Sequence, residues 1–199
     1  MDKMLKIFIL FYIFIHNTSF SNANRNSVVN YLESFDTLQS DFVQINNNGE
    51  VLSGKIFVSR PGKFRIEYLQ IPLLIICDSK RLAVINKDLK SISFHLLDEI
   101  PIGILLFKEL SLKEIEIIKI IEKDNILTAK VVNSKFKDKG FLELRFEKSP
   151  FIMKKWTVFK TDDTKTEVFF DRLSLNYKIK AKLFDIESED PRQIPFKIY

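Results

Sequence analysis

Few side chains of this sequence could do chemistry, and they are scattered along it. His95 is the only histidine after the first 23 residues, and Cys77 is the only cysteine. A Ser-His-Asp or Cys-His arrangement would therefore have to be built around His95. One histidine and one cysteine, without a spaced cluster of further ligands, do not make a tetrahedral metal site. The sequence predicts no catalytic residue, no metal and no cofactor.

The remaining candidates for chemistry are equally weak. Glu67, Asp78, Glu143 and Asp171 are acidic, but each has the setting of a surface residue, whereas hydrolysis by two carboxylates needs a convergent pair. The five glycines are spread over the chain and form no phosphate-binding loop. Cys77 lies in the apolar run LLIICDS, where a buried thiol packs as a small hydrophobe. An enzyme that uses His95 and nearby acids is kept only as a third hypothesis.

The first 23 residues have the pattern of a cleaved signal peptide. A basic start (MDKMLK) precedes an apolar run and the small-residue sequence SNA at 21–23. The run from Ile7 to Ile15 is about half of the roughly 20 residues that span a bilayer. No cysteine for lipid attachment follows it, so we expect residues 24–199 to form one soluble domain in the periplasm. The net charge of +5 is spread along the chain and predicts no nucleic-acid binding.

An N-terminal helix is indicated by apolar residues at intervals of three and four. This spacing runs from Val28 to Leu38 and makes one helical face apolar. Asn26 and Ser27 are candidate N-caps. We expect the apolar face to lie against a sheet.

From about Ser40 the apolar period changes to two, which is typical of strands. Eleven such segments follow one another: DFVQI, VLSGKIFVS, KFRIEY, LLIICD, RLAVIN, SISFHLL, EIEIIKIIE, ILTAKVVN, FLELRFE, IMKKWTVFK and KTEVFFDRLSLNY. Most of their connections are short, which favours antiparallel pairing. About eleven strands exceed what a flat sheet usually holds. We expect a mainly β fold with some α: one antiparallel, strongly curved, unclosed β-barrel.

Residues 99–112 interrupt the strands with Pro101 and Gly103, followed by an apolar run. They predict a short apolar helix over the concave face of the sheet. Strands with clean alternation predict one wet face and one apolar face rich in Phe. Periodicity alone leaves open whether this apolar face is filled by the protein's own side chains or holds a hydrophobic ligand.

Four segments, in this order, resemble the LolA family of periplasmic lipoprotein carriers. They are FDTLQSDFVQ (35–44), GKIFVSRPGKFRIEY (54–68), IPLLIICDSKRLAVIN (71–86) and IPIGILLFKE (100–109). The resemblance implies an incomplete barrel with a helical lid and with lipoprotein acyl chains held inside. The sequence departs from the family at Asp78-Ser79, where Asp-Gly is usual, and in LAVIN, where an aromatic strand is common.

The resemblance also implies which residues form the site. Arg60 and Pro61 occupy the Arg-Pro corner that opens and closes the lid, and Arg65 is a weaker candidate at the same mouth. The lid helix would include Ile102, Ile104, Leu105, Leu106 and Phe107. The candidates for lining the cavity are Phe57, Phe64, Ile66, Phe94, Phe141 and Phe146.

By the same resemblance, the expected cargo is acylated lipoproteins. They would be received from an inner-membrane lipoprotein-releasing ABC transporter and passed to a LolB-like receptor at the outer membrane. A carrier that hands over cargo mouth to mouth is expected to be a monomer. The alternative within the same fold is a periplasmic binding protein for free lipids or other hydrophobic ligands.

Overall fold

The computed structural model describes residues 22–95, 101–106, 115–134, 138 and 140–193. Residues 22–33 form an N-terminal α-helix. The strands are β1 (Thr37–Ile45), β2 (Val51–Ser59), β3 (Lys63–Tyr68), β4 (Leu73–Asp78), β5 (Leu82–Asn86), β6 (Ser91–His95), β7 (Ile115–Lys123), β8 (Ile126–Asn133), β9 (Phe141–Lys148), β10 (Phe151–Phe159) and β11 (Lys165–Leu175). Short 3-10 helices are η2 (Pro101–Leu106), η4 (Ala181–Phe184) and η5 (Glu187–Glu189).

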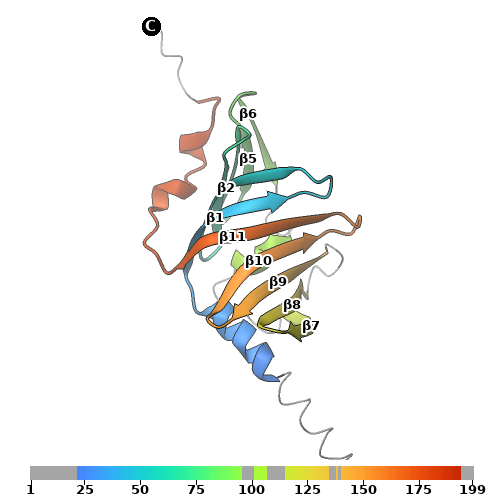
Figure 1. The fold of residues 1–199 in the computed structure, drawn as a ribbon. Helices are drawn as coiled ribbons and strands as arrows, with labels where there is room; N and C mark the ends of the chain where they lie inside the picture. Colours follow the sequence, from blue (N-terminus) through green and yellow to red (C-terminus); the bar gives the residue numbers. More distant parts are fainter. Residues whose placement is uncertain (1–21, 96–100, 107–114, 135–137, 139, 194–199) are drawn as a thin grey trace, which may run out of the picture.

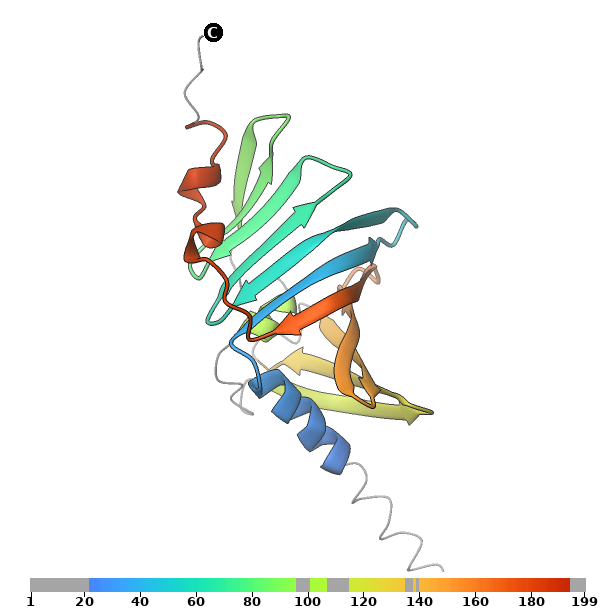
Figure 2. The same ribbon diagram turned by 60° about the vertical axis from the view of Figure 1, so that its left-hand side comes forward.

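All eleven strands belong to one antiparallel sheet, in the order β6-β5-β4-β3-β2-β1-β11-β10-β9-β8-β7. Each strand pairs with its neighbour in sequence, except that β6 and β7 are not paired and β1 pairs with β11. The strands follow one another around a curve that stays open between β6 and β7 (Figures 1 and 2). This confirms the predicted unclosed barrel.

The main core lies on the face of the sheet that packs against the N-terminal helix and η2, which we call the inner face. In β2 the inner residues Leu52, Ile56 and Val58 are buried and alternate with more exposed residues. Successive side chains of a strand point to opposite faces, so this alternation follows from the sequence period of two. The helix adds Val28, and η2 adds Leu105, to the same core.

The N-terminal helix differs from the prediction at both ends. It already includes residues 22–26, so Asn26 and Ser27 are not its caps. The Ser27 hydroxyl instead donates to the carbonyl oxygen of Ala23, one turn earlier (3.0 Å). The helix ends at residue 33, and Phe35 is buried from the segment that leads into β1. Near its start, Arg25 Nη2 donates to the carbonyl oxygen of Ile117 in β7 (2.8 Å).

The predicted lid helix is described only in part. Pro101–Leu106 is a 3-10 helix, a form that proteins use in short pieces. Leu105 and Leu106 are buried in the core. Phe107 lies outside the described residues, as do the side chains of Ile102 and Ile104.

A second, smaller apolar cluster lies on the opposite, outer face of the sheet. It joins β4 and β5 through Leu74, Ile76, Ala83 and Ile85. Ile186, between η4 and η5, covers these residues and is 2% exposed. The C-terminal segment 181–190 thus lies along the outside of the sheet (Figure 1). In the described part of the chain, no helix is long and apolar enough to cross a membrane.

Candidate functional site

The corner between β2 and β3 brings the sheet into contact with η2. Gly62 has a φ of +75°, a conformation that favours glycine, and its N–H donates to the carbonyl oxygen of Leu106 (2.8 Å). A Cβ at position 62 would lie 3.0 Å from the Cα and Cβ of Ser79. Glycine therefore permits both the turn and its close approach to the neighbouring hairpin.

Arg60, which begins this corner, is buried between the sheet, the N-terminal helix and η2. Its Nε donates to the carbonyl oxygen of Leu105 in η2 (2.8 Å). Its Nη1 donates to the carbonyl oxygens of Leu32 and Phe35, the latter at 3.1 Å. We call these three hydrogen bonds the Arg60 junction. The guanidinium also lies over the Phe35 ring, 3.8 Å from its centroid.

The last carbonyl groups of a helix have no partner within the helix. Leu32 is in the final turn of the N-terminal helix, and Arg60 supplies a donor to its carbonyl oxygen. A planar guanidinium presents several N–H groups in fixed directions, so it can bond two elements at once. The Arg60 junction therefore joins the end of the helix to η2.

The electrostatic setting of Arg60 is unusual for a buried cation. It is 7% exposed, and burial lowers its pKa to about 10, with the nearby Asp36 carboxylate acting in the opposite direction. The side chain therefore remains protonated at neutral pH. Among the described residues, no carboxylate forms a salt bridge with it, and its Nη2 has no hydrogen-bond partner.

An aromatic cluster packs beneath the N-terminal helix. The Tyr31 ring makes edge contacts with Phe146 (centroids 5.2 Å apart) and Phe151 (5.8 Å). Phe146 and Phe151 stack on each other at 4.8 Å. The inner face here is thus lined with rings, as the Phe-rich strands predicted.

Strand parity places the six predicted cavity residues on both faces of the sheet. Phe64, Ile66 and Phe146 belong to the inner core. The other three, Phe57, Phe94 and Phe141, lie on the outer face and do not line the inner one. Phe57 pairs with Arg65, Phe94 pairs with Ala83 of the outer cluster, and Phe141 stacks on Phe159 at 4.4 Å.

Arg65 also lies on the outer face, away from η2. Its Nη1 donates to the carbonyl oxygen of Leu183 (3.0 Å), and its Nη2 forms a salt bridge with Glu189 (2.8 Å). Its Nε bonds to Glu67. These contacts hold the C-terminal segment against the sheet. The expectation that Arg65 lies at the mouth was wrong, because residues 60 and 65 face opposite sides of the hairpin.

The candidate chemical groups are not brought together. His95, on the edge strand β6, is exposed and its ring contacts the Ser93 hydroxyl at 3.4 Å. Cys77 is fully buried, and burial raises its thiol pKa, which disfavours the reactive thiolate. Within the described ranges, no group of three or more His, Cys, Asp or Glu side chains could hold a metal ion.

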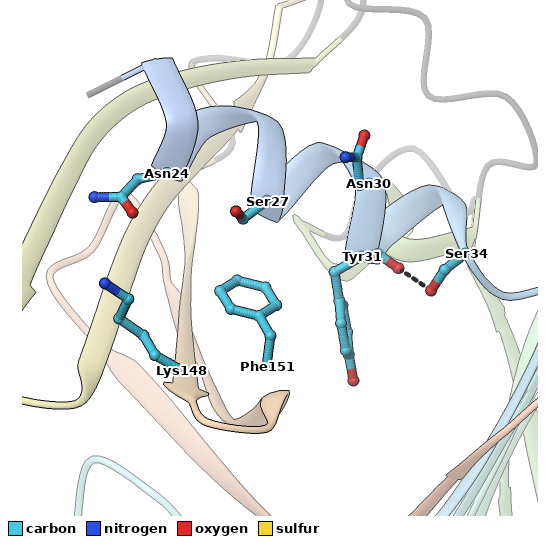
Figure 3. A pocket seen from close by; sticks show the side chains of 7 residues that line it. All are labelled: Asn24, Ser27, Asn30, Tyr31, Ser34, Lys148 and Phe151. Atoms are coloured by element: carbon cyan, nitrogen blue, oxygen red, sulfur yellow. Dashed lines mark hydrogen bonds between the residues drawn. The ribbon is translucent and has the colours of Figure 1, made fainter. Parts of the chain in front are cut away.

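A surface pocket of about 490 Å³ opens beside the N-terminal helix. It is lined by Asn24, Ser27, Asn30, Tyr31 and Ser34 of the helix segment and by Lys148 and Phe151 of β9 and β10. Figure 3 shows the Tyr31 ring pointing from the helix toward the side where Phe151 lies, whereas the Asn30 side chain points away from Phe151. The sequence did not predict this pocket, although the spacing of residues 24, 27, 31 and 34 places them on one face of the helix.

Comparison with known proteins identifies the family. The family model described as outer membrane lipoprotein carrier protein LolA matches residues 33–187. The chain belongs to the LolA family. This match includes the Arg60 corner, η2 and the C-terminal segment up to residue 187. The LolA family is a periplasmic carrier family rather than an enzyme family, and it carries lipoproteins. Family membership thus points to a carrier of hydrophobic ligands.

Individual relatives are distant. Uncharacterized protein RP864 of Rickettsia prowazekii (strain Madrid E) is 23% identical over 172 residues, covering 85% of this chain and 79% of the relative. A DUF1329 family protein from Desulfovibrio piger has a similar fold, with a TM-score of 0.51, 9% identity, and coverage of 84% of this chain and 98% of that one. LolA superfamily protein NE2245 from Nitrosomonas europaea has a TM-score of 0.48 and 6% identity, with coverage of 82% and 98%.

Proposed function

We propose that this protein shelters the acyl chains of lipoproteins against its inner face and carries them through the periplasm from the inner to the outer membrane. In this proposal residues 1–23 are a cleaved signal peptide and residues 24–199 are the carrier. An inner-membrane ABC transporter supplies the cargo, and a LolB-like protein receives it. Family membership supports the class of cargo.

The observation that carries the proposal is the Arg60 junction. It joins the two elements that cover the aromatic inner face, the N-terminal helix and η2, through hydrogen bonds to three carbonyl oxygens. If these bonds break, the two elements are released together and the inner face becomes accessible. Because the cation has no ion-pair partner among the described residues, the closed arrangement is only modestly favoured.

The free energy of exposing an acyl chain to water explains why a carrier must both shelter the chain and release it. Each acyl CH₂ exposed to water costs about 0.8 kcal/mol, so a chain of about 15 methylenes represents roughly 12 kcal/mol. A lipoprotein does not cross an aqueous compartment with this surface exposed. A carrier that held the chains with the whole of this free energy would not release them. A closed state that competes with the cargo lowers the net affinity.

The test is mass spectrometry of material that copurifies with the exported protein. Arg60→Leu removes all three bonds of the junction and thus weakens the closed state that competes with cargo. We expect acylated lipoproteins on the wild type and more of them on Arg60→Leu. Arg145→Leu is the matched control, because Arg145 is exposed on β9 and takes no part in the junction.

Two results would count against the proposal. Free lipids alone on both proteins would favour the binding protein for free hydrophobic ligands. Equal amounts of lipoprotein on wild type, Arg60→Leu and Arg145→Leu would remove the role of the junction in release.

A further inference from the structure

Three buried polar atoms of the described residues lack a hydrogen-bond partner: the Tyr31 hydroxyl, Arg60 Nη2 and the Thr157 hydroxyl. Buried polar groups are nearly always paired, so each exception calls for an explanation. Tyr31 and Arg60 lie on the inner side, and they contact the same ring, that of Phe35. Thr157 follows the core residue Trp156 in β10 and therefore points to the outer face.

Tyr31 is 8% exposed, and its surroundings are aromatic. Phe146 and Phe151 contact its ring, and Phe35 lies 6.2 Å away between centroids. Burial raises the pKa of the phenol, and the backbone N–H of Met153, which approaches the phenol oxygen, partly offsets this. An N–H group can only donate to that oxygen, so the phenol O–H itself still has no acceptor. A phenylalanine would make the same ring contacts without burying an unpaired hydroxyl. Packing therefore does not explain why the residue is a tyrosine.

The position of Tyr31 links it to both the pocket and the junction. Its side chain is part of the lining of the 490 Å³ pocket, and Figure 3 shows the hydroxyl at the end of the side chain far from the helix. The carbonyl oxygen of Leu32, the next residue, accepts a hydrogen bond from Arg60 Nη1. Movement of the helix after release of the junction would uncover the Tyr31 hydroxyl to a ligand that enters along the inner face.

We propose that the Tyr31 hydroxyl donates a hydrogen bond to an ester carbonyl of the bound acyl group. This inference rests on the proposed carrier function and specifies how the site recognises its ligand. An unpaired O–H group needs an acceptor, and an aromatic setting disfavours a charged one. An ester-linked acyl chain carries a neutral acceptor at its head, the ester carbonyl oxygen. One hydrogen bond at this point fixes the depth of the chain, which apolar contacts alone do not do.

Tyr31→Phe tests the proposal because it keeps the ring and removes only the hydroxyl. The probes are a synthetic peptide with an S-diacylglyceryl cysteine and its dialkyl ether analogue. The analogue lacks the two ester carbonyl groups. Binding is measured by isothermal titration calorimetry with the mature chain. We expect Tyr31→Phe to bind the ester peptide about tenfold more weakly and the ether peptide as the wild type does. The Tm of the free variant should rise by about 2 °C, because an unpaired buried group is lost.

Two control variants separate ligand recognition from a general effect of the substitution. Tyr68→Phe removes a hydroxyl that already donates to Gln44 Oε1 (2.9 Å), so its Tm should fall. Its ratio of affinities for the ester and ether peptides should stay that of the wild type. Thr157→Val removes the unpaired hydroxyl on the outer face, so its Tm should rise with no change in affinity. A diacyl phospholipid as a third probe shows whether the recognised ester belongs to a lipoprotein or to a membrane lipid.

The outcomes are distinguishable. Tyr31→Phe binding the ester peptide as tightly as the wild type overturns the role of Tyr31 but leaves the carrier function intact. An equal loss for the ester and ether peptides also overturns it, since the carbonyl would then be irrelevant. Failure of the wild type to bind any acylated probe contradicts the carrier function itself and this inference with it.

Discussion

Arg60 is a buried cation whose described hydrogen-bond partners are all backbone carbonyl oxygens. Side-chain substitutions elsewhere cannot remove those partners, so the junction depends on residue 60 itself. The sequence, through its resemblance to the LolA family, indicated a role for Arg60 at the lid. It did not predict the contacts with Leu32 and Phe35. The sequence around a helix end does not indicate which distant side chain will bond the last carbonyl groups.

Hydrogen exchange at Gly62 provides a residue-level test of the junction. The Gly62 N–H donates to Leu106, next to the Leu105 carbonyl that Arg60 holds, so both bonds fix the same turn. In Arg60→Leu, loss of a charged hydrogen bond worth about 1.5–3 kcal/mol should raise Gly62 exchange at least about tenfold. NMR-detected exchange measures this. The Leu69 N–H, bonded to Ser53 at the other end of the hairpin, should be unaffected; unchanged exchange at Gly62 would contradict the coupling.

At the scale of elements, the pairing of β2 with β3 depends on a close backbone approach. A Cβ on Gly54 would lie 2.0 Å from the Glu67 carbonyl oxygen. We expect Gly54→Ala to lower the free energy of unfolding by about 3 kcal/mol, as measured by urea denaturation. Gly49→Ala is the control: it has open space but a φ of +83°, so it should cost only about 1 kcal/mol. Equal losses of unfolding free energy for the two variants would show that the close approach of β2 to β3 at Gly54 adds no cost of its own.

The C-terminal segment should stabilise the outer face of the sheet. Ile186 is 2% exposed over the outer cluster, so Ile186→Ala should lower the free energy of unfolding by about 3 kcal/mol. Leu89→Ala, at a residue 75% exposed, should change it by no more than about 0.5 kcal/mol. Thermal or urea unfolding distinguishes them. A small effect of Ile186→Ala would mean that the segment does not contribute to the fold.

The sequence predicted the strands. It did not show in every strand which side chains point to the inner face. In β2, Ile56, Phe57 and Val58 are all apolar, and only pairing shows that Phe57 faces outward. The run LLIIC in β4 is apolar on both faces because both are covered. Nothing in the sequence pattern indicated that residues 181–190 cover the outer face.

At the scale of the whole molecule, the N-terminal helix packs against the open sheet and is hydrogen-bonded to other elements near both of its ends. Arg25 bonds to the edge strand β7 near the start of the helix, and Arg60 bonds to its last turn. The sequence predicted the curved sheet, the helix and the family. The Arg25 bond joins residues 92 positions apart, and the Arg60 bond to Leu32 joins residues 28 positions apart. Local periodicity cannot reveal such distant contacts. A carrier with this design should open by movement of the helix while the sheet keeps its shape.

The most direct test of the carrier function is extraction of acylated cargo from a membrane into solution. Liposomes that carry a diacylated lipopeptide are mixed with the mature protein and sedimented, and lipopeptide in the supernatant is measured. We expect a soluble complex of protein and acylated peptide, formed in larger amount by Arg60→Leu, and none with the same peptide lacking acyl groups. Lipopeptide that stays with the liposomes for both proteins would contradict the claim that this chain carries lipoprotein acyl chains.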